Sequence, residues 1–133
     1  MADKDKAEKI LKYIKDKKIN EPYPVMSIYP AIKKTSKYWE DYYLDCEAGK
    51  PYHYLNAGIW PYIGSFYVLA LIKLKKYDEA EKELKKLAEA NLRGNFPEWI
   101  NSVDKKMNGQ MQAWDAGTYI FAYESLKKKK VLI

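Results

Sequence analysis

Two stretches of the sequence carry side chains that suit a neutral polar ligand: YHYLNAGIWPY at residues 52–62 and FPEWINSVDKKMNGQMQAWD at residues 96–115. A sugar has apolar ring faces and hydroxyl edges, so aromatic rings stack on it while polar side chains bind its edges. Along the chain the aromatic candidates are Trp39, Trp60, Trp99 and Trp114, and the polar candidates are Asn56, Gln110, Gln112 and Asp115. These residue types favour a carbohydrate pocket, although a tryptophan taken alone is more often part of a core.

The second stretch places a single carboxylate, Glu98, between Pro97 and Trp99. Most of the 18 acidic residues are free to lie in water, so an acid in this aromatic frame is unusual. Two interpretations stay open at this point. Glu98 acts on a bound ligand, or it caps or brackets the short turn that follows Pro97.

The segments YLNAGIWPYI, FPEW and GQMQAWDAGTYI occur in an order and spacing that resemble the C-terminal third of the six-hairpin (α/α)6 glycoside hydrolases. That group contains glycogen-debranching amylo-α-1,6-glucosidases, neutral or alkaline invertases and mannosylglycerate hydrolases. The resemblance covers about residues 22–126. The positions that correspond are Asn56, Gly58, Trp60, Pro61, Pro97, Glu98, Gln112 and Trp114.

The resemblance implies a role for Glu98 as the general base, which activates a water on the opposite face of the sugar ring from the general acid. It also implies that Asn56, Trp60, Gln112 and Trp114 line the glycone subsite. Three positions depart from the pattern. Leu55 replaces the usual histidine, although His53 lies two positions earlier and joins the candidates, Ala57 replaces a glycine, and Asp115 replaces a small hydroxyl residue.

The length of the chain is a larger departure, because a complete toroid of this type has twelve helices and its general acid lies in an earlier segment. We therefore expect the chain to bind an oligosaccharide or glucoside, and to hydrolyse a glucosidic bond with inversion only when another segment completes the ring. Self-association or a partner chain would cover the open sides of the arc.

The hydrophobic pattern predicts an all-α fold with about four main helices in one domain, residues 1–133. The helices at residues 2–18 and 78–92 are amphipathic, whereas those at 58–75 and 110–126 are apolar on most sides. Asp78 and Glu81 have the spacing of a capping box. Alternating outer and inner helices suit a partial (α/α) toroid, but a small irregular helical bundle explains the same pattern. Residues 19–57 predict a Pro- and aromatic-rich loop compatible with a short helix at 36–46, and residues 127–133 form a basic tail.

A different class of function is suggested by LIKLKKYDEAEKELKKLAEAN at residues 71–91, which resembles one tetratricopeptide unit. Such a module would bind a protein partner without catalysis. The unit occurs only once in the sequence, and stacked repeats need about three.

Other classes find little support in the composition. The formal charge is +6, but the four lysines Lys127–Lys130 supply most of it and Arg93 is the only arginine, so we expect no nucleic acid partner. One cysteine, Cys46, excludes an internal disulfide and is interpreted as a small buried side chain. No metal or cofactor motif is visible, so we expect neither. The uncharged stretch at residues 51–72 is broken by Pro61 and Gly64, so we expect no membrane span and a cytoplasmic protein.

Overall fold

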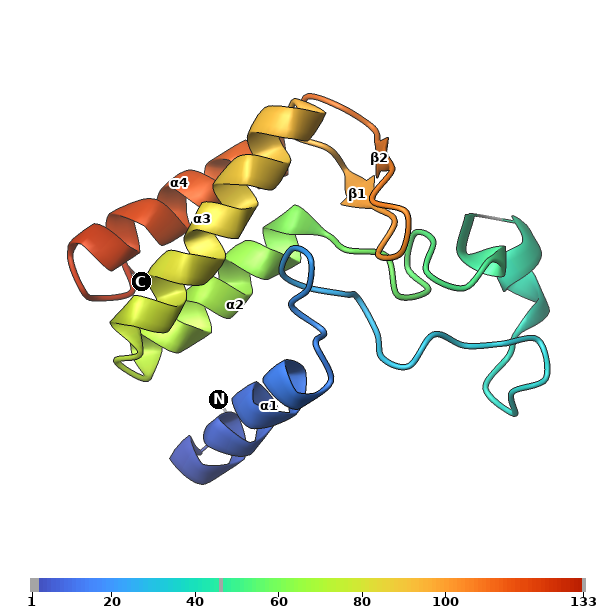
Figure 1. Ribbon diagram of the computed structural model, residues 1–133, viewed down its shortest axis with the longest axis horizontal. Helices are drawn as coiled ribbons and strands as arrows, with labels where there is room; N and C mark the ends of the chain where they lie inside the picture. The colour runs from blue at the N-terminus through green and yellow to red at the C-terminus, as the bar shows by residue number, and fades with distance from the viewer. Residues whose placement is uncertain (1–2, 46, 133) are drawn as a thin grey trace.

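The computed structural model describes residues 3–45 and 47–132 of the 133-residue chain, so the interpretation of Cys46 as a buried side chain lies outside the described residues. Within those ranges the fold is all-α, as predicted, with one very small sheet (Figure 1). The helices are α1 (Lys4–Asp16), η1 (Asp41–Asp45), η2 (Glu47–Gly49), α2 (Pro61–Lys73), α3 (Tyr77–Gly94) and α4 (Ala113–Lys127), and the strands are β1 (Trp99–Ile100) and β2 (Met107–Asn108).

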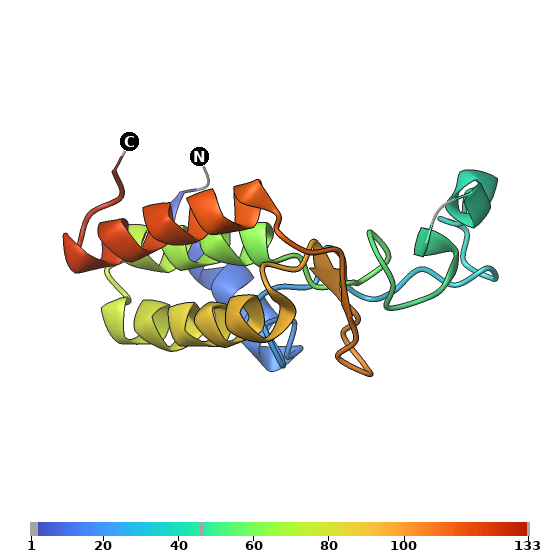
Figure 2. The same cartoon turned by 90° about the horizontal axis from the view of Figure 1, so that it is seen from above.

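Helices α2, α3 and α4 pack against one another, and α2 and α4 run in the same direction while α3 runs in the opposite one (Figure 2). The N-terminal ends of α2 and α4 therefore lie at the same end of the bundle, facing β1, β2 and the long loops (Figure 1). This arrangement brings the two loops that precede α2 and α4 close together. Both predicted ligand-binding stretches belong to these loops.

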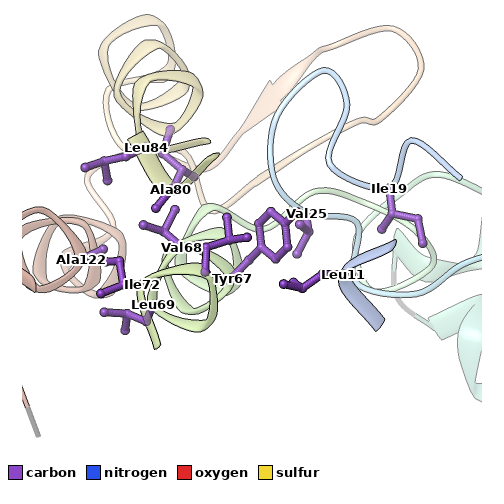
Figure 3. Packing of buried hydrophobic residues seen from close by; sticks show 12 residues of the cluster. Leu11, Ile19, Val25, Tyr67, Val68, Leu69, Ile72, Ala80, Leu84 and Ala122 are labelled. Carbon is purple, nitrogen blue, oxygen red and sulfur yellow. The ribbon is translucent and has the colours of Figure 1, made fainter. Parts of the chain in front are cut away.

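Helix α2 is the centre of the hydrophobic core, because its sequence is apolar on nearly every side and Pro61 occupies its first turn, where no amide donor is needed. Figure 3 shows Tyr67, Val68 and Ile72 between Leu11 and Val25 on one side and Ala122 on the other. The side chains of Ala80 and Leu84 pack on the same cluster from α3. The prediction of an enclosed helix at this position is largely confirmed.

Helix α1 is held to α3 by two ion pairs, Lys15 with Glu79 and Lys76 with Glu8, the second at 3.0 Å. Its apolar stripe reaches the core through Leu11, which is buried. Charged residues cover its other side. Helix α1 is thus the one-sided helix that its sequence predicts, starting two residues later and ending two residues earlier than expected.

Helix α4 differs from the expectation of an enclosed helix. Of its residues only Asp115, Ala122 and Ser125 are buried in the described structure. Trp114, Ile120 and Tyr123 are about half exposed, at 50%, 60% and 48%. An apolar helix needs partners on all sides to be enclosed, and the described residues cover only one side of α4. Phe66 of α2 is also 53% exposed, so large apolar side chains of both helices face solvent in the described structure.

The helix boundaries correct two local predictions. The capping box at Asp78 and Glu81 is wrong, because α3 begins at Tyr77 and its N-cap, Lys76, makes no side-chain capping bond. The short helix expected at residues 36–46 appears as the 3-10 turn η1, five residues later than predicted.

A small set of backbone pairings ties the two loops together. Strands β1 and β2 are antiparallel, with Trp99 opposite Asn108, and Ile59 bridges Ile100 on the other side of β1. A further bridge joins Met26 to Ile59. None of these pairings spans more than two residues. In the described part of the chain, no helix has both the length and the apolar character needed to cross a membrane.

Candidate functional site

Glu98 is positioned by backbone hydrogen bonds on both sides of it. After it, Ile100 exchanges two bonds of 2.8 Å with Ile59, two residues before α2 begins. Before it, the Phe96 carbonyl accepts from the Gln112 amide at 3.1 Å, at the residue that caps α4. A partly buried Glu98 is therefore held at the N-terminal ends of α2 and α4.

Gly109 forms the surface against which Glu98 packs. Its backbone has φ +67°, a left-handed conformation that favours glycine. A Cβ atom at this position would lie 2.7 Å from the Cβ of Glu98 and 3.3 Å from its Oε2. The absence of a side chain at Gly109 thus leaves the room that the Glu98 side chain occupies.

Asp115 is a second carboxylate at the same end of the bundle. It is only 1% exposed, and neither of its side-chain oxygens has a hydrogen-bond partner among the described residues. Burial raises its pKa to about 7; the Tyr62 amide, in the first turn of α2, acts in the opposite direction, and the negative charge of Glu98 adds to the increase. The Tyr62 amide lies near enough to act on the charge of Asp115 but does not complete a hydrogen bond with it.

An unbroken series of aromatic contacts runs from β1 to the start of α4. The ring centroids of Trp99 and Tyr54 are 6.2 Å apart, those of Tyr54 and Trp60 4.9 Å, those of Trp60 and Tyr62 5.9 Å, and those of Tyr62 and Trp114 6.3 Å. Trp60 is 5% exposed and donates its indole N–H to the Tyr54 carbonyl. Its ring is therefore buried within the series and does not face solvent. Trp114, at the other end, is 50% exposed to solvent.

A pocket of about 460 Å³ lies between the β1–β2 pair and the long loop that precedes α2. It brings together two predicted residues, His53 and Trp99, whose rings are 5.5 Å apart. The other lining residues are Lys34, Leu44, Glu47, Gly49, Lys50, Asn101, Lys106 and Asn108. This volume is within the range of small-molecule sites. Trp99 is only 3% exposed, so it supports the wall behind His53, and His53 and the amide groups of Asn101 and Asn108 are the side chains that suit a sugar.

The remaining predicted residues lie in different settings. Asn56 is buried, and its amide donates to the carbonyls of Ile32 and Ala48 while its oxygen accepts from the Ile32 amide, so both amide protons are used within the loop. Gln112 is partly buried at the N-cap of α4. Trp39 packs on Tyr43 with ring centroids 5.3 Å apart, beside η1, in the part of the chain drawn farthest from α4 (Figure 1).

The site therefore has two groups of predicted residues. Glu98, Gln112, Trp114 and Asp115 gather at the ends of α2 and α4, whereas His53 and Trp99 line the pocket. Sequence reasoning missed Tyr54 and Tyr62, which link the groups, and Gly109, which makes room for Glu98. Tyr54 and Tyr62 stand within the aromatic motif YHYLNAGIWPY and could have been found there, but no sequence signal connects Gly109 to Glu98. In the described ranges no cluster of three His, Cys, Asp or Glu side chains could hold a metal ion.

Comparison with known protein families shows to which family the chain belongs. A model of the alkaline and neutral invertases, glycoside hydrolase family 100, matches residues 1–129. The chain belongs to the alkaline and neutral invertase family. No curated protein matches the chain in a comparison of sequences.

Membership of the alkaline and neutral invertase family confirms the resemblance to glycoside hydrolases drawn from FPEW and its neighbouring motifs. It gives the chain a carbohydrate-active, hydrolase-like role with a saccharide as the substrate class. The match includes residues 71–91, so the segment that resembles a tetratricopeptide unit is part of the invertase family sequence.

Proposed function

We propose that the chain supplies part of the saccharide pocket of a glycoside hydrolase, with Glu98 as the general base for inverting hydrolysis of a glucosidic bond. The observation that carries this proposal is the position of Glu98. It is held between the N-terminal ends of α2 and α4, and the half-exposed Trp114 lies in the first turn of α4, in a chain of the invertase family. In the alternative role, Glu98 would bracket the turn after Pro97. The structure gives no hydrogen bond of the Glu98 carboxylate that favours this role.

The proposed reaction uses Glu98 to accept a proton from water. The water oxygen then forms a bond to the anomeric carbon while the bond from that carbon to the leaving oxygen breaks. A general acid on the opposite side of the ring donates a proton to the leaving oxygen. We propose that this acid comes from another helical segment, since inverting enzymes need two carboxyl groups about 6.5–9.5 Å apart with room for the water.

The exposed apolar side chains of α2 and α4 suggest where that segment packs. Ile120 and Tyr123 are exposed on one side of α4 and Phe66 is exposed on α2, and exposed apolar side chains that gather in a patch commonly mark interaction sites. We propose that a partner chain or a second copy of this chain covers these side chains and completes the helical arrangement. Ile120→Lys would then reduce association seen by light scattering, while Val103→Lys, an exposed change on the β1–β2 loop, would not. A wild-type chain that stays monomeric at all concentrations would contradict the association.

Binding is tested by tryptophan fluorescence during titration with sucrose and with malto-oligosaccharides. Wild type should show saturable quenching, and Glu98→Gln should keep binding within a few-fold because the amide retains the size of the carboxylate. Glucose release, where the complete assembly supports it, should be lost in Glu98→Gln and kept in Glu124→Gln, a partly buried acid near the other end of α4. Absence of quenching by every saccharide would overturn the proposed function.

Two conservative variants show which group of residues binds the sugar. Trp114→Phe removes the fluorophore at the helix ends, and Trp99→Phe removes the one in the pocket beside His53. The variant that loses the quenching identifies the subsite. Trp114→Phe is expected to lose more of the signal, because Trp114 is 50% exposed whereas Trp99 is 3% exposed.

A further inference from the structure

The pocket between the β1–β2 pair and the long loop before α2 carries a local excess of positive charge. The described residues that line it include three lysines, Lys34, Lys50 and Lys106, and one carboxylate, Glu47. Outside the basic tail at residues 127–130 the chain is close to neutral. The charge of the pocket is therefore a local feature and not part of a uniformly basic surface.

The ammonium groups of these three lysines are not neutralised by the protein. Within residues 3–45 and 47–132 none of them forms an ion pair, whereas lysines of α1 and α3 do. Asp104, two residues before Lys106, accepts from the backbone amide of Lys106 at 2.8 Å and not from its ammonium group. The Nζ atom of Lys34 lies 6.0 Å from the Trp39 ring centroid, a contact that leaves its charge unpaired. The three charges are thus available to an anion.

One buried side chain fixes the two loop segments that carry Lys34 and Lys50. The Asn56 amide group donates to the carbonyls of Ile32 and Ala48, at 2.9 and 3.0 Å, and its oxygen accepts from the Ile32 amide at 2.7 Å. Lys34 follows Ile32 by two residues, and Lys50 follows Ala48 by two. The backbone that carries both lysines is therefore in place before a ligand binds, which lowers the cost of binding.

The β1–β2 side of the pocket adds a neutral donor, Asn101, which is 4% exposed. Its side-chain oxygen accepts from the backbone amides of Val103 and Asp104, at 2.8 and 3.1 Å. Its NH2 group has no partner among the described residues, so this is the end of the side chain that remains for a ligand. The backbone amide of Asn101 also donates to the Lys106 carbonyl at 2.9 Å. This bond keeps the backbone of Lys106 next to the donor.

We propose that the pocket binds the phosphate group of a phosphorylated saccharide. Three lysines against one glutamate leave an excess of two positive charges, which matches the roughly two negative charges of a phosphate monoester at neutral pH. Lysine ammonium groups and N–H donors are common ligands of phosphate. His53 and Asn108 line the same pocket and remain for the hydroxyl edges of the sugar. This inference names the class of saccharide and so rests on the proposed function.

Isothermal titration calorimetry with glucose 6-phosphate and with glucose tests the preference for a charged sugar. Glucose 6-phosphate is expected to bind at least about tenfold more tightly, because hydrogen bonds to charged groups are the stronger ones. Lys34→Gln and Lys106→Gln should each reduce this preference by more than half and leave the affinity for glucose unchanged. Lys33→Gln and Lys105→Gln are the matched controls, since these sequence neighbours do not line the pocket. Equal affinity for the two sugars, or an equal loss in the controls, would overturn the phosphate site.

The place of the phosphate is tested at Asn101. Asn101→Asp keeps the oxygen that accepts from Val103 and Asp104 but replaces the NH2 donor by an acidic oxygen. Binding of glucose 6-phosphate should be lost, while the thermal unfolding temperature stays close to that of wild type. In the wild type, saturation with inorganic phosphate should shift the side-chain ¹⁵N resonance of Asn101. A resonance that does not move, or an Asn101→Asp variant with normal affinity, would overturn the site.

Two further ligands separate the remaining outcomes. Glucuronate carries one negative charge and should bind more weakly than glucose 6-phosphate, so equal or tighter binding of glucuronate would overturn the choice of phosphate. Saccharides that bind without any preference for phosphate would overturn this inference and leave the proposed function standing. If inorganic phosphate binds but no saccharide does, both the proposed function and the saccharide part of this inference are overturned.

Discussion

Ile59 and Ile100 exchange two backbone hydrogen bonds of 2.8 Å, and this single pair joins the loop before α2 to the strand that follows Glu98. Both side chains are fully buried, in a small cluster with Tyr23 and Ala90 that is separate from the main core. The cluster links the loops to α3. The position of Glu98 therefore depends on packing at some distance along the chain from Glu98 itself.

Ile100→Ala is expected to destabilise the protein by about 2–5 kcal/mol, because it removes buried methyl groups and leaves a cavity. The backbone bonds to Ile59 need no side chain, so the loss comes from packing. Chemical unfolding followed by circular dichroism measures it. Val103→Ala, at a position 64% exposed in the same β1–β2 loop, should change stability by about 0.5 kcal/mol or less. Equal effects of the two changes would contradict the packing role.

Asn56→Ala is expected to cost about 1–3 kcal/mol, since the buried carbonyl of Ala48 and both backbone groups of Ile32 lose their partner. The loop from residue 32 to residue 48 should also become more sensitive to a protease under native conditions. Asn108→Ala serves as the control, because its amide makes only a local bond to the Lys106 carbonyl. A variant with wild-type stability and protease resistance would show that Asn56 does not hold the loop.

The helices could be predicted from the sequence because local periodicity determines them. The apolar run YIGSFYVLALIK and the amphipathic stretch that contains Ala80, Leu84 and Leu87 each specify a helix and its buried face without reference to the rest of the chain. The exact start of α3 was not predictable in this way. Its first turn begins at Tyr77, whose ring packs on the core, and this tertiary contact outweighs the capping potential of Asp78.

The site was predictable only in its residue types. Motifs such as FPEW and QAWD identified Glu98 and Asp115, but the alignment of the segments that carry them depends on a backbone bond between residues far apart in sequence, Gln112 with Phe96. Strands of two residues have no hydrophobic period that a sequence can reveal. The same limit applies to Asn56, whose residue type suits a sugar or a loop equally well. Only the three-dimensional contacts distinguish the two uses.

The stability of the wild type is expected to depend on pH through Asp115. Its pKa is about 7 in the folded protein and near 3.8 when unfolded, so the folded state binds more protons between these values. Stability therefore falls as the pH rises from about 4 to about 7, by up to roughly 4 kcal/mol for a shift of about three units. Asp115→Asn has no such proton, so its stability relative to wild type should increase over the same range.

Urea unfolding at several pH values between 5 and 8 measures this difference, and other titrating groups cancel because they are common to both proteins. Glu124→Asn is a suitable control for a charge removed from α4 at a partly buried position. A constant difference in unfolding free energy between Asp115→Asn and wild type would show that Asp115 is charged throughout the range.

Gly109→Ala is expected to weaken saccharide binding more than it weakens the fold. The left-handed backbone at φ +67° costs alanine about 1–2 kcal/mol, and the new methyl group would meet the Cβ of Glu98 at 2.7 Å, so the Glu98 side chain must move. Gly117→Ala is the matched control, because a Cβ there meets nothing within 4 Å and lies in α4. Gly117→Ala should be neutral or stabilising by about 1 kcal/mol, as alanine favours helix. Fluorescence titration and thermal unfolding of both variants separate the two effects, and wild-type saccharide affinity in Gly109→Ala would show that Glu98 does not need its place against Gly109.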